Sequence, residues 1–286
     1  MGIATISGTI VIEFVAMPAA CKNGLSRAVY GFILSSTMNR LTCLLTTVVG
    51  FAAGAHAADA PAPNALSPQE QAAGWRLLWD GKTVDGWRSA RAEAFPQSGW
   101  TIKDGELIVA ETSGGESAAG GDIITREKFS DFELVVDFKI TAGANSGIKI
   151  FVDPGLNKGE GSAIGPEFQI LDDAKHPDAK LGRNGNRTIG SLYDMIPAPA
   201  DKLVMPIGEW NHARILSLDQ HVEFWLNGRK TVEFERGSPA WKETVALSKY
   251  KVWPAFGELQ QGHILLQDHG NQVAFRNIKI RVPAAH

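Results

Sequence analysis

The segment 165–173 carries residues with a clear capacity for chemistry. Its sequence, GPEFQILDD, alternates polar Glu167 and Gln169 with apolar Phe168 and Ile170. A period of two is typical of a strand that packs on one face and leaves the other face open. A carboxylate and an amide on an open face can hydrogen-bond a hydroxyl-rich ligand, and the carboxylate can also act as a general base. We therefore expect Glu167 and Gln169 to lie in the functional site.

A second polar set lies near the end of the chain, in the sequence HILLQDH that ends at His269. By alternation, Ile264 and Leu266 share a face that suits the core, so we expect Gln267 and His269 on the open face. An imidazole titrates near neutral pH and can serve as an acid, a base or a metal ligand. Asp268 has the opposite parity, and we expect it to anchor the following turn.

Further polar residues lie on other expected strands. Arg214, His221 and Trp225 each alternate with apolar neighbours, which predicts that they lie on the open face. A tryptophan there can stack on the apolar side of a sugar ring or simply pack, and an exposed histidine is more often solvated than catalytic. Asn145 lies two residues before Gly147, where the absent side chain would let a ligand approach closely.

One connection is too long to be a simple turn. Residues 172–194 are rich in Gly, Asn, Arg and Lys, and such a loop is either functional or a solvated surface loop. Arg183 and Arg187 on it could close over an oxygen-rich ligand. Tyr193 at its end could protonate a leaving oxygen, or it could pack.

The elements expected around these residues are almost all strands. Two pairs, Asp104-Gly105 and Asn227-Gly228, lie between alternating runs and predict hairpins. A capping box near residue 67 and a Ser-Pro pair near residue 238 predict two short helices. We therefore expect an all-β domain, a jelly-roll β-sandwich of two antiparallel sheets. The expected strands are 75–79, 100–103, 106–110, 132–140, 146–152, 167–171, 212–218, 221–226, 229–234, and a closing hairpin of 263–268 and 272–280.

The start of the chain has a different character. A positive charge at Arg40, an apolar run that ends at Gly54 and an Ala-x-Ala pattern that ends at Ala57 predict a signal peptide over 38–57. Its apolar core is shorter than the roughly 20 residues that a membrane-spanning helix needs. We therefore expect an exported protein, periplasmic or secreted, with no membrane span in the mature chain.

The expected signal peptide divides the rest of the chain. Residues 1–37 precede a second plausible start at Met38, so a misassigned start codon or an unusually long leader would explain them. A linker at 58–66 and a single domain at 67–286 follow. That domain is long enough to be one large all-β unit.

Composition excludes several classes of function. Both cysteines, Cys21 and Cys43, precede the expected cleavage point, so disulfides, thiolate metal sites and cysteine nucleophiles are excluded from the mature chain. The net charge is −3 with both signs spread along the sequence, which argues against nucleic acid or an acidic membrane as a partner. No partner protein is evident.

A series of motifs resembles a known family. The motifs are LWDGKTVDGW at 78–87, GDIIT at 121–125, NSGI at 145–148, EFQILDD at 167–173, GSLYD at 190–194, GEWN at 208–211, WLNG at 225–228 and LQDHG at 266–270. In this order, from about residue 74 to residue 282, they resemble the 3-keto-disaccharide hydrolase domain. The resemblance implies a concanavalin-like β-sandwich, export in bacteria, and action on glycosides whose ring is oxidised to a ketone at carbon 3. Members are associated with cleavage by elimination and with hydration of the resulting glucal.

That chemistry needs a base for the hydrogen at C2, a donor or cation for the enolate oxygen, and an acid for the leaving group at C1. We assign Glu167 as the base, and His269 and Tyr193 as the other catalytic residues. The expected substrate-binding residues are Gln169, Gln267, Trp225, His221, Arg214, Asn145 and Arg183. A divalent cation is compatible with a convergence of Glu167, His269 and His221, although no compact ligand motif is present, and no other cofactor is expected.

Two alternatives remain open. A conventional glycosidase needs two carboxylates about 5–5.5 Å or roughly 6.5–9.5 Å apart, whereas Glu167 and Asp173 would lie about 20 Å apart along an extended strand. A carbohydrate-binding module without catalysis could use the same sandwich, with Trp225 stacking on the sugar.

Overall fold

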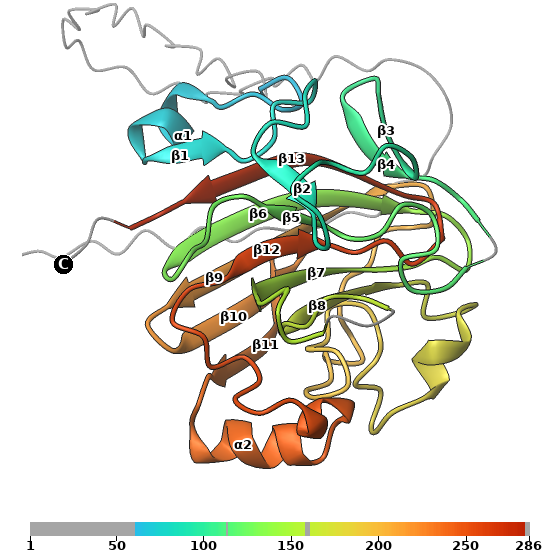
Figure 1. Cartoon of the computed structure of the whole chain (residues 1–286), viewed down its shortest axis with the longest axis vertical. Coiled ribbons are helices and arrows are strands. Elements are labelled where there is room, and N and C mark those ends of the chain that lie inside the picture. The colour runs from blue at the N-terminus through green and yellow to red at the C-terminus, as the bar shows by residue number, and fades with distance from the viewer. Residues whose placement is uncertain (1–60, 113, 158–160, 284–286) are drawn as a thin grey trace, which may run out of the picture. The chain divides into compact units, whose positions relative to one another are not determined.

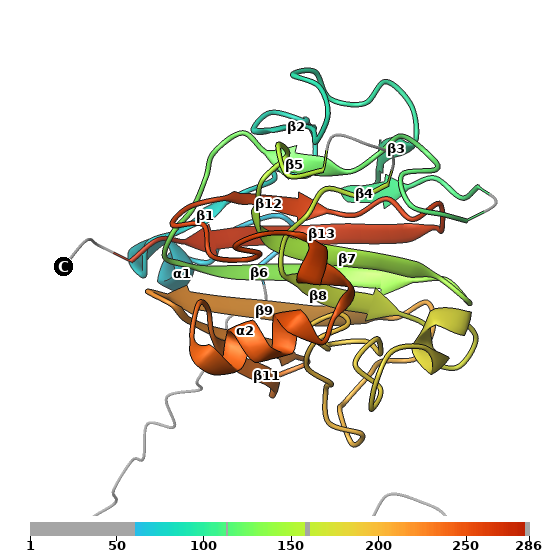
Figure 2. The same cartoon turned by 60° about the horizontal axis from the view of Figure 1, so that its bottom comes forward.

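A computed structural model describes residues 61–112, 114–157 and 161–283 of the 286-residue chain. The upstream region 1–37 and the expected signal peptide 38–57 lie outside these residues. The described residues form two antiparallel sheets that pack face to face, with two short α-helices (Figures 1 and 2). The predicted all-β sandwich is confirmed.

The larger sheet has eight strands. They are β1 (Trp75–Leu77), β3 (Trp100–Lys103), β4 (Glu106–Val109), β6 (Phe132–Ile140), β9 (Trp210–Leu218), β10 (His221–Leu226), β11 (Arg229–Glu235) and β13 (Val273–Arg281). Their order is β11-β10-β9-β6-β13-β4-β3, and β1 pairs with β13.

The smaller sheet has five strands, which are β2 (Trp87–Ser89), β5 (Ile123–Thr125), β7 (Asn145–Val152), β8 (Glu167–Leu171) and β12 (His263–Leu266). Their order is β2-β5-β12-β7-β8. Aromatic side chains join the two sheets: the ring of Phe168 on β8 lies 6.3 Å from Phe138 on β6 and 5.5 Å from Phe224 on β10, between ring centroids. The core therefore lies between the inner faces, and each sheet has an outer face.

Local turn chemistry explains the two tight hairpins. Asp104 and Gly105 between β3 and β4 have φ values of 52° and 74°, and Asn227 and Gly228 between β10 and β11 have 49° and 80°. Two consecutive positive φ values are those of a type I′ turn, which suits the twist of the strands. Both predicted hairpins are confirmed.

The predicted closing hairpin is wrong. β12 belongs to the five-stranded sheet and β13 to the eight-stranded sheet, so the chain crosses between sheets after Leu266. Asp268 holds this crossing: it is fully buried and accepts the N–H groups of Ala119, Gly120 and Gly121 at 2.7–2.8 Å. Asp268 also accepts the Gly270 N–H at 2.8 Å, so it binds the turn that follows it, as the sequence predicted, although that turn does not belong to a hairpin.

The helices begin where the sequence predicts. α1 (Pro68–Ala72) opens with a capping box, in which Ser67 Oγ accepts the Glu70 N–H at 3.1 Å and Glu70 accepts the Ser67 N–H at 2.7 Å. α2 (Pro239–Ala246) is capped by Ser238. Two 3₁₀ helices, η1 (Pro177–Lys180) and η2 (Lys249–Val252), complete the elements. In the described part of the chain, no helix has the length and apolar character to cross a bilayer.

Candidate active site

The outer face of the five-stranded sheet carries the candidate active site. Glu167 on β8 pairs with Lys149 on β7, and residues paired across antiparallel strands project to the same face. The neighbouring Phe168 projects into the core. Glu167 therefore projects to the outer face, as its alternation predicted. This face is covered by loops here, so Glu167 is only 2% exposed.

The carboxylate of Glu167 lies across Gly147. A Cβ atom at position 147 would stand 2.1 Å from Glu167 Oε1, so the space that the sequence offered to a ligand is taken by this carboxylate. The ammonium of Lys149 lies 3.7 Å from Oε2. Burial raises the pKa of Glu167, and the charge of Lys149 opposes that rise. A carboxylate with a raised pKa is a stronger base than an ordinary one.

We expect Gly147→Ala to lower turnover by about 10²-fold, because the new methyl group must displace the Glu167 carboxylate and a shift of about 1 Å in a catalytic group has effects of this size. Steady-state kinetics would measure the loss. Thermal melting would show that the sheet still folds. Full activity in a folded Gly147→Ala protein would contradict the assignment of Glu167.

Lys149 connects the site to the loop that covers it. Its Nζ donates to the carbonyl of Ala163 at 3.0 Å and to Ser162 Oγ. Ser162 in turn donates to Asp122, which also accepts the Ala163 N–H at 3.1 Å. Burial raises the pKa of Asp122, but its Oδ2 is occupied by these two bonds and its Oδ1 accepts the Asp268 N–H at 3.0 Å. Asp122 therefore positions the loop and Lys149.

Amide groups continue the same face. Gln169 pairs with Gly147, and the Gln267 N–H donates to the carbonyl of Gly147 at 2.9 Å, so two glutamines flank the glycine from neighbouring strands. Gln169 Nε2 donates to Asn145 Oδ1 at 3.2 Å. The Oε1 atoms of both glutamines are buried and have no partner among the described residues. Because buried polar atoms are almost always hydrogen-bonded to protein or to water, these acceptors are available to donors from a bound molecule, either water or a ligand.

His269 extends this polar strip and meets a second histidine. Its Nδ1 is also buried and lacks a partner within the described ranges, and its ring contacts His176 with centroids 5.7 Å apart. Burial and the neighbouring His269 lower the pKa of His176, which favours neutral imidazole. Five predicted site residues are thus brought together on or beside this face: Glu167, Gln169, Gln267, His269 and Asn145.

A cavity of about 200 Å³ lies beside Lys149. Lys249 and Tyr250 line it from η2, and Glu116 lines it from the loop before β5. Lys249 Nζ lies 4.0 Å from the Glu116 carboxylate. Lys249 and Glu116 are also among the charges that affect the pKa of Glu167, so this cavity lies near Glu167.

Tyr193 lies near the site, but its hydroxyl is engaged elsewhere. It donates to Asp178 Oδ2 at 2.7 Å, and Asp178 also binds Arg187 at 2.7 Å. Burial raises the pKa of Tyr193, and the bond to Asp178 raises it further. This geometry does not support the predicted role of Tyr193 as the proton donor.

The long loop that contains Tyr193 is packed against the site. Asp173 accepts the Ile189 N–H at 2.8 Å and pairs with Lys202 at 3.1 Å. Arg187 is bound inside the loop, whereas Arg183 lies on its exposed part. The loop delivers His176 to the site, and a role for Arg183 in closing over a ligand stays a prediction.

Three predicted residues lie on the opposite side of the sandwich. Phe224 packs into the core, so Trp225 beside it projects outward from the eight-stranded sheet. His221 has the same parity as Trp225, and Arg214 is paired with Trp225. The prediction that His221, Trp225 and Arg214 share a face with Glu167 is wrong, because alternation distinguishes the two faces of a strand but not the sheet to which the strand belongs.

On that distant face His221 lies in a charge cluster. Its Nδ1 lies 2.7 Å from Glu235, and its Nε2 lies 3.5 Å from Glu233 and 3.7 Å from Glu223. Among the described residues, His221, Glu223 and Glu233 are the one group with the spacing of metal ligands. The ammonium of Lys230 binds both glutamates. A cation held jointly by His221 and Glu167 is therefore excluded by geometry, because the two residues lie on different sheets.

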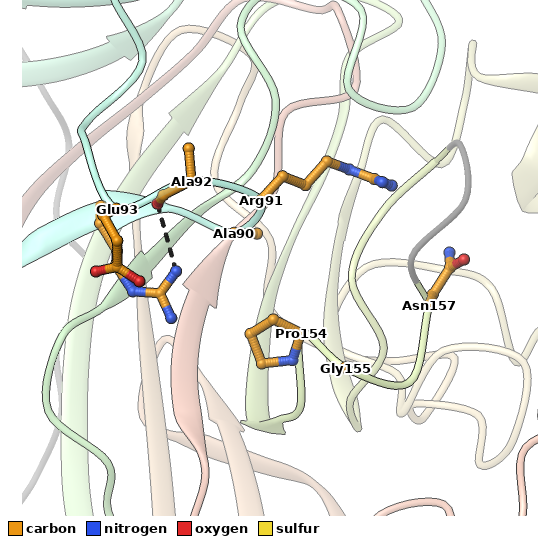
Figure 3. Close-up of a pocket in the computed structure, with 8 residues that line it drawn as sticks. Ala90, Arg91, Ala92, Glu93, Pro154, Gly155 and Asn157 are labelled. Carbon is orange, nitrogen blue, oxygen red and sulfur yellow. Dashed lines mark hydrogen bonds between the residues drawn. The ribbon is translucent and has the colours of Figure 1, made fainter.

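A larger hollow, of about 490 Å³, lies at the β2 edge of the five-stranded sheet (Figure 3). Arg88 and Glu167 lie at the two ends of one row of paired residues that runs across all five strands. Four strand spacings separate them, which is about 19 Å. Ala163 packs over the middle of this row. Arg88 and Arg91 line the hollow and bind backbone carbonyls, so we assign the chemistry to the smaller cavity beside Glu167.

Sequence reasoning missed several residues of the site, which are Lys149, Asp122, His176, Lys249 and Tyr250. Lys149 could have been predicted from the sequence, because it is the one charged residue between Ile148 and Ile150. It is separated from Asn145 by an even number of residues along the strand, so the two side chains project to the same face. The others lie outside long alternating strands, where no periodic pattern reports their direction.

Comparison with known proteins agrees with this architecture. Residues 74–281 match the family model described as a 3-keto-alpha-glucoside-1,2-lyase-like domain. The chain is 38% identical over 239 residues to a 3-keto-disaccharide hydrolase from Bacteroides thetaiotaomicron, covering 77% of this chain and 82% of that protein.

Two solved structures from Parabacteroides distasonis, each titled a "putative glycosyl hydrolase", share the fold. One has a TM-score of 0.67 at 31% identity and covers 78% of this chain and 100% of its own. The other has a TM-score of 0.53 at 30% identity and covers 73% and 99%. The match over 74–281, with this fold and these relatives, shows that the chain belongs to the family of 3-keto-alpha-glucoside-1,2-lyase-like domains.

Proposed function

We propose that this protein cleaves the glycosidic bond of sugars that carry a ketone at carbon 3. Family membership and the relative from Bacteroides thetaiotaomicron support a carbohydrate hydrolase. The observation that carries the finer proposal is the pair of Glu167 and Lys149: a buried base with a raised pKa and an ammonium 3.7 Å apart.

The pair matches what elimination at a 3-keto sugar needs. A ketone at C3 acidifies the hydrogen at C2, so Glu167 takes that proton and the electron pair moves toward the C3 oxygen. The ammonium of Lys149 stabilises the resulting enolate. The C1–O bond then breaks, and water can add to the product. Because C2 and C3 are adjacent atoms, the base and the cation must lie a few ångströms apart, as these two do.

The amide strip supplies recognition of the ring. Gln169 Oε1, Gln267 Oε1 and His269 Nδ1 are buried and unpaired within the described ranges. Sugar hydroxyl groups both donate and accept, so they can pair with the two glutamine oxygens and with His269 Nδ1 in either tautomer. The side-chain amide of Gln169 is oriented by the hydrogen bond that its Nε2 donates to Asn145 Oδ1.

The two alternatives are less well supported. For a conventional glycosidase, Asp173 is paired with Lys202, Asp122 is filled by hydrogen bonds, and Glu116 lies against Lys249, so Glu167 has no second free acid among these. A binding module needs no buried base. Trp225, on which that alternative depended, lies on the other sheet.

The proposal is tested by incubating the protein with 3-keto-trehalose and, in parallel, with trehalose, in D₂O and with or without EDTA. Cleavage of the keto-sugar alone, with deuterium at C2 of the released 3-keto-glucose, would support elimination and hydration. Cleavage of trehalose without deuterium would favour a conventional glycosidase. Binding without cleavage would favour a module, and loss of activity with EDTA would reveal a metal.

The pH dependence of kcat/KM should report the burial of Glu167. The base must be ionised to accept a proton, so activity rises with pH through its pKa. Because burial raises that pKa above the ordinary 4.5, the acidic limb should lie above pH 4.5. A pH–rate profile from pH 3 to 9 on a 3-keto-glucoside would measure it, and a limb at or below pH 4.5 would argue against Glu167.

Export stays a proposal, based on the signal-like segment 38–57. Amino-terminal sequencing of the protein purified from its native host tests it. A mature terminus close to residue 58 would support export, and a terminus at Met1 or Met38 would argue against it.

A further inference from the structure

Tyr250 presents a buried hydroxyl that has no hydrogen-bond partner among the residues that the structure describes. The residue is 2% exposed and lines the cavity beside Lys149 and Lys249. Native proteins rarely leave a buried hydroxyl unpaired. Tyr250 therefore combines a buried donor that has no partner among the described residues with a position in the wall of the cavity beside Lys149.

The position of this hydroxyl is set by contacts made elsewhere on the residue. Its ring stacks on Phe256 at 4.1 Å and 12°, and Phe256 stacks on Trp241 at 5.8 Å and 3°. The backbone N–H of Tyr250 donates to Ser248 Oγ at 3.1 Å. The phenol is therefore held rigidly while its proton stays free, which is the preorganisation that a proton donor needs.

The surrounding charges keep this phenol protonated. Burial raises the pKa of Tyr250, and the charge of Glu167 raises it further, so the proton is present at neutral pH. The ammonium of Lys249 lies 5.3 Å from the ring centroid and would stabilise a phenolate. The hydroxyl of Tyr193, by contrast, donates a hydrogen bond to Asp178.

We propose that Tyr250 is the catalytic acid that protonates the leaving oxygen at C1. The proposal rests on the proposed function, because elimination from a 3-keto-glycoside with a poor leaving group requires such a donor. It also replaces Tyr193 in that role.

The step balances without an oxidant or reductant. Glu167 gains the C2 proton, and the C2–H electron pair forms the enolate. When the enolate collapses, C1 and C2 become doubly bonded, the C1–O pair leaves with the oxygen, and that oxygen takes the phenol proton of Tyr250. Proton transfer from Glu167 to the phenolate, directly or through water, restores both groups.

The test compares leaving groups in Tyr250→Phe. With 3-keto-trehalose, whose leaving oxygen needs a proton, we expect kcat to fall by about 10²- to 10³-fold. With 4-nitrophenyl 3-keto-glucoside, whose phenolate leaves without one, the fall should be less than about 10-fold. The melting temperature should not fall, because the variant removes no hydrogen bond. Equal losses on both substrates, or no loss on either, would overturn the assignment.

Tyr193→Phe is the matched control. It removes the same atom from a second tyrosine whose ring lies against Lys249, but it breaks the bond to Asp178, so it should lower the melting temperature and affect both substrates alike. A second measurement uses 3-fluorotyrosine at position 250, which lowers the phenol pKa and should shift the basic limb of the pH profile downward. An unchanged limb would count against Tyr250. If the wild-type protein cleaves no 3-keto-glycoside, the proposed function itself fails and this assignment falls with it.

Discussion

Glu167→Gln should reduce turnover of a 3-keto-glycoside by about 10²- to 10⁴-fold or more, since a positioned general base contributes an effect of that size. Glutamine keeps the shape of the side chain across Gly147 but cannot accept the C2 proton. Binding of the sugar should survive, because Gln169, Gln267 and His269 are untouched. Steady-state kinetics and calorimetric titration with the 3-keto substrate would measure the two effects separately.

The same variant should be at least as stable as the wild type at neutral pH. Burial raises the folded-state pKa of Glu167, so its contribution to stability is fully present below the ordinary value of 4.5 and is lost as pH rises through the folded pKa. Glutamine has no charge to bury and avoids that loss. Thermal melting at pH 4 and pH 7 would show whether the advantage of the variant grows with pH.

Glu235→Gln provides the matched control for Glu167→Gln. It makes the same acid-to-amide change at an exposed position of the other sheet, where the Glu235 carboxylate binds His221. Activity should stay within about 2-fold of the wild type, since surface changes away from a site have small effects. If Glu167→Gln and Glu235→Gln have equal activity, Glu167 is not the base.

Asp268→Asn should be the most destabilising of these single changes. The buried carboxylate accepts N–H groups from Ala119, Gly120 and Gly121 on one oxygen and from Gly270 on the other. An amide can offer only one acceptor oxygen, so its NH₂ group must face at least one N–H donor. We expect a loss of about 3 kcal/mol, which for a domain of this size lowers the melting temperature by roughly 6–12 °C.

Scanning calorimetry of Asp268→Asn beside Asp201→Asn would measure this effect. Asp201 is exposed, so its amide variant should melt within about 2 °C of the wild type. Activity of Asp268→Asn should also fall, because Asp268 holds the crossing that carries Gln267 and His269. A melting temperature equal to that of Asp201→Asn would show that the N–H groups find other partners.

Strands with long alternating patterns, and turns with special backbone conformations, could be predicted from the amino-acid sequence alone. β6, β8 and β10 have the bounds that alternation predicted, because side-chain direction along a strand is a local property with a period of two. The turn at Asn227-Gly228 was predictable for the same reason, since it needs only two residues that tolerate positive φ. The two short helices followed from their caps.

Short strands and sheet membership were decided by the tertiary structure. β2 and β5 have three residues each, which is too few for a period to be seen, and they exist because neighbouring strands pair with them. β12 and β13 both alternate, but nothing local shows that they belong to different sheets. The error of joining them in a hairpin therefore came from long-range pairing that a sequence pattern does not contain.

The residues of the candidate site also fall into those whose direction the sequence predicted and those whose position depends on the tertiary structure. Alternation along each strand predicted correctly that Glu167, Gln169 and Gln267 project away from the core. It predicted the same, also correctly, for Trp225 and His221. Only the stacking of two sheets decided that the first set shares one face and that the second set lies on the opposite side of the sandwich. Tyr250 lies on η2, and the position of η2 depends on ring stacking and loop packing. The sequence did not predict that Tyr250 lines the cavity, because periodic patterns indicate side-chain direction only within regular strands and helices.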